Sequence, residues 1–261
     1  MGILNVTPDS FADGGVHFDA GRAVDAGVRM VGDGADIIDV GGESTRPGAE
    51  PLLEDEELRR VIPVVERLAR SVTVPISIDT YKARVAREAI AAGATIVNDV
   101  SGLLYEPALG GAVAETGAAL VLMHTRGRSR GMYQEAVYTD VVAEVRAELE
   151  QAIARAESAG VAREALILDP GVGFAKRAEH SFAVLSQLDA FAALDRPILS
   201  GPSRKSFLKS AIGDVPPEAR EWATAAAVTA SVLHGAHIVR VHGVRAMVDV
   251  VRAADALRAS R

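Results

Sequence analysis

Short apolar runs recur along the chain and are separated by longer stretches of mixed character. Such runs are typical of strands that are buried on both faces of a parallel sheet. The expected strands are GILN (2–5), DIID (36–39), PISID (75–79), TIVND (95–99), LVLMH (120–124), LILD (166–169), PILSG (197–201) and HIVRVH (237–242). The pattern therefore predicts eight strands.

The stretches between these runs have helical periodicity. Residues 138–160 carry apolar side chains at 141, 142, 145, 149 and 153, which form one stripe on a helix that ends near a glycine. Residues 20–34 and 52–71 are further expected helices, and Pro63 is expected to kink the second of them. Regular alternation of strand and helix implies a parallel sheet with right-handed crossovers.

Eight strand–helix units in 261 residues fit a (β/α)8 TIM barrel, which typically needs about 250 residues. No linker or low-complexity stretch divides the chain, so we expect one α/β barrel domain over residues 1–261, with long loops after the first two strands. A doubly wound sheet is the alternative, but it would normally carry a glycine-rich phosphate-binding fingerprint. Residues 32–37 and 171–176 lack the third glycine of that fingerprint, which favours the barrel.

Composition narrows the function classes. The net charge of −7 argues against a general nucleic-acid-binding protein, although a local basic pocket remains compatible with it. No apolar run approaches the ~18 residues of a membrane span, and the first residues do not resemble a secretory signal. The absence of cysteine excludes disulfides, thiolate metal sites and a cysteine nucleophile. We expect a cytoplasmic protein without a nucleic-acid or membrane partner.

Every expected strand delivers a polar residue to its C-terminal end, the end that carries the chemistry of a barrel enzyme. These residues are Asn5, Asp39, Asp79, Asn98 with Asp99, His124, Asp169, Ser200, and Arg240 with His242. A single Asp or Asn in such a place is often a helix cap or turn former, but caps require neither a histidine nor an arginine. Asp39 receives less weight, because the glycines after it suggest that it orients loop backbone.

Basic residues follow the last two expected strands. Arg204 and Lys205 stand at the start of a short expected helix, and Arg240 and His242 alternate on the last strand, so they share a face. Phosphate commonly binds over these loops in barrels. Lys205, Arg240 and His242 therefore predict a clamp for a diphosphate, with a solvated basic rim as the alternative.

Asp79, Asn98 and Asp169 form a second group, from the third, fourth and sixth strands. Carboxylates accept hydrogen bonds from amino and ring N–H groups, and an amide both donates and accepts. The group therefore suits a flat, nitrogen-rich heterocycle, with a buried polar cluster as the alternative. Two carboxylates are weak evidence for a metal cage, although Mg²⁺ needs few protein ligands when phosphate supplies the rest.

Other conspicuous side chains are expected to have structural roles. Met123 and His124, on the fifth strand, are expected to form a wall of the pocket, and Trp222 is expected to pack near the start of the seventh helix.

Eight motifs, in order, cover residues 2 to 244: GILNVTPDSFADGG, DVGGESTRPGA, SIDTYKA, NDVSG, LMHTRG, ILDPGVGFAK, SGPSRKSFL and VRVHGV. Together they resemble the dihydropteroate synthase family of pterin-binding barrels. The resemblance implies a transferase of folate biosynthesis that joins 4-aminobenzoate to a pterin diphosphate with Mg²⁺, acts as a homodimer and is a target of sulfonamides.

The resemblance also implies roles for individual residues. Lys205, Asp79, Asn98 and Asp169 would bind the pterin, Asn5 would bind Mg²⁺, and Asn5, Thr45, Arg240 and His242 would bind the pyrophosphate. The 4-aminobenzoate side would comprise Thr45, Arg46, Pro47, Phe174 and Ser206, and Asp9, Ser10 and Phe11 of the first loop would close over it. Asp79, Lys205, Arg240 and His242 would act in catalysis, by an SN1-like displacement of the diphosphate.

The sequence departs from the family pattern in places. The family usually has a β-hairpin ahead of GILN, Arg128, Ser129 and Arg130 stand where a shorter turn is expected, and Thr125 replaces a larger pocket residue. Rival functions are a pterin-dependent methyltransferase, a Schiff-base aldolase that uses Lys205, and a catalytically silent pterin-binding barrel. The methyltransferase does not need to bind diphosphate, so the STRPG and SRKS segments argue against it.

Overall fold

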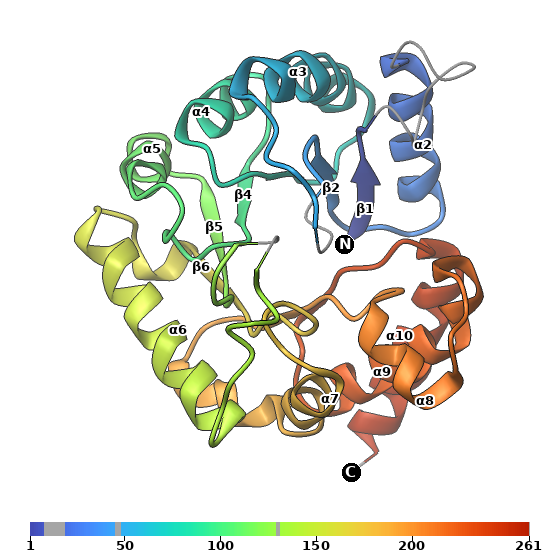
Figure 1. Cartoon of the computed structure of the whole chain (residues 1–261). Coiled ribbons are helices and arrows are strands. Elements are labelled where there is room, and N and C mark those ends of the chain that lie inside the picture. The colour runs from blue at the N-terminus through green and yellow to red at the C-terminus, as the bar shows by residue number, and fades with distance from the viewer. Residues whose placement is uncertain (8–18, 45–47, 129–130, 261) are drawn as a thin grey trace.

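The computed structural model describes residues 1–7, 19–44, 48–128 and 131–260, which form a ring of parallel strands surrounded by helices (Figure 1). The eight strands of these residues are β1 (Gly2–Asn5), β2 (Ile38–Gly41), β3 (Ile76–Asp79), β4 (Ile96–Asp99), β5 (Ala119–Met123), β6 (Leu166–Asp169), β7 (Leu199–Ser200) and β8 (Ile238–Val239). All eight expected strands are therefore confirmed in chain order.

The strands close into a cylinder. β1 to β6 pair in parallel in chain order, and β7 pairs in parallel with β8. Isolated parallel bridges join these two sheets at both edges, from Leu168 to Ile198 and from Gly2 to Val241. The Ile3 N–H donates to the Val241 carbonyl at 2.9 Å, which completes the last seam. The (β/α)8 barrel is confirmed, and the doubly wound sheet is excluded.

Helices cover the outside of the barrel (Figure 1). They are α2 (Ala20–Gly32), α3 (Glu54–Ser71), α4 (Ala83–Ala91), α5 (Ala108–Thr116), α6 (Val141–Ser158), α7 (Ala178–Ser186), α8 (Lys209–Ile212), α9 (Glu221–Leu233) and α10 (Val244–Ala259). Short 3₁₀ turns lie at η1 (Arg163–Ala165), η2 (Leu188–Leu194), η3 (Ser206–Leu208) and η4 (Pro217–Arg220). α3 runs through Pro63 without a break in helical structure.

The sequence of α6 shows why a helix forms here. The Asp140 carboxylate accepts a hydrogen bond from the Ala143 N–H at 3.1 Å and so caps the first turn. The apolar stripe at 141, 142, 145, 149 and 153 is buried, as its spacing predicts. The helix ends before Gly160, whose φ of +94° is a conformation that glycine adopts at little cost.

The last strand is shorter than predicted. β8 ends at Val239, whereas the expected strand ran to His242. The Arg240 N–H still donates to the Ser200 carbonyl at 2.9 Å, but the next N–H, of Val241, donates to the Met1 carbonyl at 3.0 Å. The chain thus changes partner from β7 to the start of β1 to close the barrel, and the regular ladder stops there.

Two surface features complete the fold. Trp222, in the first turn of α9, is 88% exposed, so the prediction that it packs against the rest of the chain is wrong. Within the described ranges, the helices are too short or too polar to cross a membrane.

Candidate active site

The inward face of the barrel changes from apolar to polar along the strands. Side chains two residues apart point to the same face of a strand. Apolar residues precede polar ones by this spacing in the pairs Ile96 and Asn98, Ile167 and Asp169, and Ile238 and Arg240. The apolar members pack with the buried Met1, Val121 and Leu199. This apolar layer fills the interior of the barrel. The polar residues Asn98, Asp169 and Arg240 therefore lie at the C-terminal strand ends, where they belong to a polar layer that we call the floor of the site.

Arg240 joins two buried carboxylates in this floor. Its Nε donates to Asp39 Oδ2 at 2.6 Å, and its Nη2 donates to Asp79 Oδ2 at 2.7 Å. Asn98 Nδ2 donates to the same oxygen of Asp39 at 3.1 Å. The prediction that Asp39 orients loop backbone is therefore wrong, because its carboxylate holds two side chains of the predicted site together.

Burial shifts the pKa values of the charged groups in this floor, and neighbouring charges oppose these shifts. Burial raises the pKa of Asp79 to about 7, although Arg240 opposes the rise. Burial lowers the pKa of Lys205 to about 8, although Asp169 opposes the fall. Burial also raises the pKa of Asp169, against the effect of Lys205. Asp79, Asp169, Lys205 and Arg240 therefore share one desolvated site, which is where perturbed pKa values usually mark function.

Lys205 crosses from the loop after β7 to the loop after β6. Its Nζ donates to the Val172 carbonyl at 2.5 Å and lies 4.4 Å from the centre of the Phe174 ring. In the same loop, the Gly171 N–H donates to Asp169 Oδ1 at 2.7 Å. The predicted pterin residue Asp169 and the predicted arylamine residue Phe174 are thus held beside the same lysine.

The remaining predicted residues of the clamp and rim lie in neighbouring loops. Lys205 immediately precedes η3, so the expected short helix is confirmed, and Ser206 Oγ lies 3.4 Å from the Tyr133 hydroxyl. His242 Nδ1 lies 2.9 Å from Ser203 Oγ. Arg240 and His242 lie past the end of β8, so they are not on the regular strand that was predicted to place them on one face.

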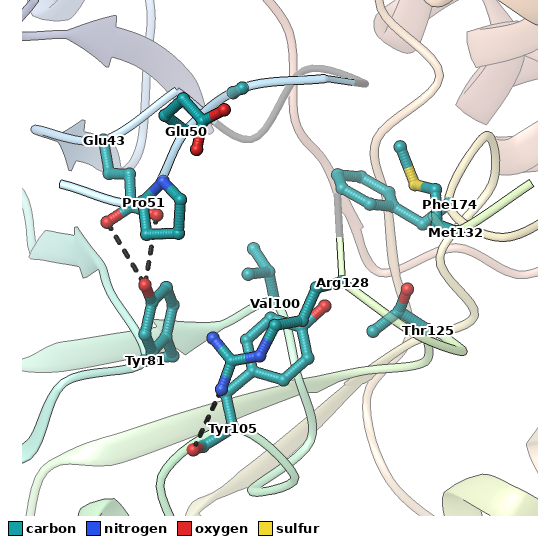
Figure 2. A pocket seen from close by; sticks show the side chains of 11 residues that line it. Glu43, Glu50, Pro51, Tyr81, Val100, Tyr105, Thr125, Arg128, Met132 and Phe174 are labelled. Atoms are coloured by element: carbon teal, nitrogen blue, oxygen red, sulfur yellow. Dashed lines mark hydrogen bonds between the residues drawn. The ribbon is translucent and has the colours of Figure 1, made fainter. Parts of the chain in front are cut away.

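A cavity of about 290 Å³ borders the floor at Lys205, because the lining residue Phe174 has its ring centre 4.4 Å from Lys205 Nζ. The Tyr81 and Tyr105 rings meet edge to face at 5.3 Å, and the Arg128 guanidinium lies 4.4 Å from the centre of the Tyr105 ring. Figure 2 shows Phe174 on the opposite side of the cavity from Tyr81. The other lining residues are Glu43, Ala49, Glu50, Pro51, Val100, Thr125 and Met132, so Thr125 is confirmed as a pocket residue.

A buried ion cluster lies beside Glu43, soon after β2, and Glu57 of α3. Lys82 Nζ donates to Glu43 Oε2 at 2.5 Å and also to Glu57 Oε2. The Leu52 N–H donates to Glu43 at 3.2 Å, so the chain just before α3 is tied to the same carboxylate. Sequence reasoning missed this cluster, although Glu57 falls in the buried stripe of α3, where a charged residue needs a partner.

Thr45, Arg46, Pro47, Asp9, Ser10 and Phe11 lie outside the described residues. Asn5, the predicted Mg²⁺ ligand, ends β1 in register with Gly41, which is in register with Asp79 on β3. Asn5 therefore stands at the same level of the barrel as the floor.

Lys176 and His124 form a further buried pair that sequence reasoning did not assign. His124 is 5% exposed and contacts Glu148 and Lys176, and neither His124 nor Met123 lines the aromatic cavity. Their place in the wall of the pterin pocket stays a prediction. A signal existed, because Lys176 is one of only four lysines beside twenty-four arginines.

The chain resembles known proteins over nearly its full length. A family model described as pterin binding enzyme matches residues 1–242. The dihydropteroate synthase of Mycobacterium leprae is 50% identical, with 98% of this chain and 92% of that protein covered. A solved dihydropteroate synthase of Xanthomonas albilineans with 4-aminobenzoic acid is 44% identical, with a TM-score of 0.92 and coverage of 99% and 92%. A Yersinia pestis dihydropteroate synthase in a sulfonamide drug complex is 42% identical, with a TM-score of 0.93 and coverage of 99% and 94%.

Proposed function

The chain belongs to the dihydropteroate synthases of the pterin-binding enzyme family, and from this premise we propose how its own residues carry out the reaction. 4-Aminobenzoate and (7,8-dihydropterin-6-yl)methyl diphosphate combine to give 7,8-dihydropteroate and pyrophosphate in folate biosynthesis. The observation that carries the assignment of residues is the desolvated floor, where two carboxylates, a lysine and an arginine lie beside an aromatic cavity.

The pterin would lie on the floor. Asp79 and Asp169 would accept hydrogen bonds from its amino and ring N–H groups, and Asn98 would both donate and accept. The side-chain amide of Asn98 is already oriented by its bond to Asp39. Its second N–H and its Oδ1 would therefore bond to the pterin. Because the floor is desolvated, each such bond would be stronger than in water.

The diphosphate would lie toward the clamp. Arg240 uses two of its five donors on Asp39 and Asp79, which leaves donors for a phosphate oxygen without breaking either bond. Lys205 and His242 would face the same anion from the loop after β7 and the end of β8. Cations that are fixed before the reaction need no reorganisation as the leaving group becomes more negative.

Mg²⁺ would enter with the diphosphate. Within the described ranges, no three His, Asp or Glu side chains are placed to hold a metal ion, so the protein alone would not form a cage. The amide oxygen of Asn5 is a hard ligand at the level of the floor, which fits an ion that takes most of its ligands from phosphate and water. When bound, the ion would neutralise charge on the diphosphate.

The displacement would be SN1-like. The bond between the pterin methylene and the diphosphate oxygen breaks with its electron pair on pyrophosphate, which leaves positive charge on the pterin. Asp79 and Asp169 would stabilise that cation, and Lys205 and Arg240 the anion. The arylamine nitrogen then forms the new C–N bond and releases a proton. An arylamine is a free base at pH 7, so no strong general base is required.

The arylamine would enter beside Phe174 and Ser206. Phe174 lines the aromatic cavity and contacts Lys205, so it borders both the cavity and the floor. Thr45, Arg46 and Pro47 would complete this side, Thr45 would also contact the pyrophosphate, and Asp9, Ser10 and Phe11 would close over it. A sulfonamide would compete for the same place.

Product formation tests the function directly. Purified protein with both substrates and Mg²⁺ should form dihydropteroate, identified by its mass, and EDTA should suppress the reaction until Mg²⁺ is added back. Methyl transfer from methyl-tetrahydrofolate to a corrinoid, without activity on the pterin diphosphate, would instead identify a methyltransferase. Substrate binding without product would identify a silent binding barrel.

We also propose that the enzyme is a homodimer. Trp222 is 88% exposed on α9, and exposed tryptophan is characteristic of interfaces rather than of free surface. Light scattering should give twice the chain mass for the wild type, and Trp222→Arg should shift the population toward the monomer. A wild-type monomer at micromolar concentration would contradict the proposal.

A further inference from the structure

A lysine that the proposed reaction does not use lies sealed behind the β6–α7 loop (residues 170–177). Lys176 is 1% exposed. Its Nζ donates to the carbonyls of Gly171 at 3.1 Å and Phe174 at 3.2 Å, and lies 2.8 Å from His124 Nδ1. Burial lowers the pKa of Lys176 to about 7, although Asp169 opposes the fall. In its charged form the ammonium group has three donors, and these three contacts use all of them. Lys176 is therefore committed to the protein and does not touch a substrate.

The network continues from Lys176 to α6. His124 Nε2 lies 2.8 Å from Glu148 Oε2, and Arg126 Nε donates to both oxygens of Glu148, at 3.1 and 3.2 Å. Burial lowers the pKa of His124 to about 4, so its ring is neutral at pH 7. A proton on Nε2, facing Glu148, leaves Nδ1 to accept from Lys176. The loop is thereby tied through two side chains to an outer helix.

The loop needs such support because of its backbone. Gly171, Gly173 and Ala175 have φ values of +69°, +79° and +45°, and the left-handed region is disfavoured for alanine. The Ala175 carbonyl accepts a hydrogen bond from the Tyr138 hydroxyl at 3.0 Å. Lys176 and Tyr138, neither of which lines the cavity, thus hold the loop through its carbonyls.

The front of the same loop faces the site. The Phe174 ring lines the cavity and lies 4.4 Å from Lys205 Nζ, which also donates to the Val172 carbonyl. We propose that Lys176 is a positioning residue that holds the carbonyls of Gly171 and Phe174 and so fixes the Phe174 ring for the arylamine substrate. The inference rests on the proposed function, in which Phe174 borders 4-aminobenzoate.

The contacts predict which substrate is affected more. Asp79 and Asn98 belong to β3 and β4, and they are oriented by Arg240 and Asp39 rather than by this loop. The other two pterin residues, Asp169 and Lys205, do contact this loop, through the Gly171 N–H and the Val172 carbonyl. Loss of the Lys176 ammonium should therefore weaken the binding of both substrates, but that of 4-aminobenzoate more, because Asp79 and Asn98 would stay in place. A lysine that served only general stability would weaken the binding of both substrates alike.

Lys176→Met tests this, because methionine nearly matches the length of lysine but donates no hydrogen bond. The KM for 4-aminobenzoate should rise by about tenfold or more, the effect expected for loss of hydrogen bonds from a buried charged group. The affinity for a non-reactive pterin, measured by calorimetry, should fall by a smaller factor, about threefold. Leu68→Ala, a fully buried change in α3 far from the loop, is the control for lost stability and should leave both values near the wild type.

Chemical rescue separates the ammonium from the side-chain volume. The chain contains no cysteine, so Lys176→Cys can be alkylated at that position alone with 2-bromoethylamine in denaturant and then refolded. The product carries an ammonium at nearly the original distance from the backbone and should recover most of the lost affinity for 4-aminobenzoate. Alkylation with iodoethane, which adds neither a cation nor a hydrogen-bond donor, should not restore it.

A milder variant keeps the test decisive if Lys176→Met does not fold. Tyr138→Phe removes only the hydroxyl that bonds to the Ala175 carbonyl and should raise the same KM about threefold. An unchanged KM in this variant, or equal losses for both substrates in Lys176→Met, would overturn the inference. Absence of dihydropteroate formation by the wild type would instead overturn the proposed function, so the two failures are distinct.

Discussion

Replacement of Lys205 or Arg240 by alanine should lower kcat by about 10²–10³. Negative charge grows on the departing diphosphate, and a preorganised cation stabilises the transition state more than the ground state. Both side chains are fixed before substrate binds, Lys205 by the Val172 carbonyl and Arg240 by Asp39 and Asp79. Steady-state kinetics at saturating concentrations of both substrates would measure the loss.

Two surface cations provide matched controls. Lys209 pairs with the 86% exposed Asp214, and Arg258 pairs with Asp255 on α10. Exposed pairs contribute little, so Lys209→Ala and Arg258→Ala should change kcat less than about twofold. Arg240→Ala also removes the partner of two buried carboxylates, so it is expected to lower stability as well as kcat. Melting temperatures must therefore be measured beside the kinetics. The rate of the Lys205→Ala variant is the result that tests the clamp. Similar rates in all four folded variants would show that the clamp is only a basic rim.

Replacement of Asp79 or Asp169 by asparagine should weaken pterin binding by about 1.5–3 kcal/mol, because each change removes a charge-assisted acceptor. The binding of 4-aminobenzoate should change far less, since neither carboxylate lies among the residues of the aromatic cavity. Calorimetry with a non-reactive pterin would measure the difference. Unchanged affinity in both variants would contradict the placement of the pterin on the floor.

A change at Asp39 should also weaken pterin binding, although Asp39 itself is not expected to contact the pterin. Its carboxylate is fully buried beneath Arg240 and Asn98 and is expected to act through them rather than on the pterin. Asp39→Asn keeps the side-chain volume but leaves Arg240 Nε with a neutral partner. Pterin affinity should fall about as far as in Asp79→Asn, while Asp99→Asn, which changes a buried carboxylate bonded to Ser101 and Leu103, should lower stability without a comparable loss of affinity.

The barrel could be predicted because its signals are local. Continuous apolar runs mark strands that are buried on both faces, and the stripe of α6 matches the helical period. The bounds of β2 could not be predicted in the same way. It extends through Gly41, and glycine carries no side chain that would reveal its place in a ladder. Similarly, the partner exchange at Val241 depends on where the ends of the chain meet, which no local pattern encodes.

Some features of the candidate site could likewise be predicted from the sequence, and others could not. The polar residues at strand ends could be predicted, since parallel strands bring their C-terminal ends to one rim. The partners that orient these residues could not, because Asp39 lies 201 positions from Arg240 in the sequence and Lys176 lies 52 from His124. Sequence shows which residues reach the rim, whereas packing determines which buried charges pair there.

Pyrophosphate release tests the central claim most directly. Purified protein should release pyrophosphate in equal amount to the dihydropteroate formed, and only when pterin diphosphate, 4-aminobenzoate and Mg²⁺ are all present. In a Lys205→Ala variant with the melting temperature of the wild type, the rate of pyrophosphate release and the rate of dihydropteroate formation should fall by the same factor. Equal release of pyrophosphate with and without 4-aminobenzoate, or none from the wild type with both substrates, would contradict the account.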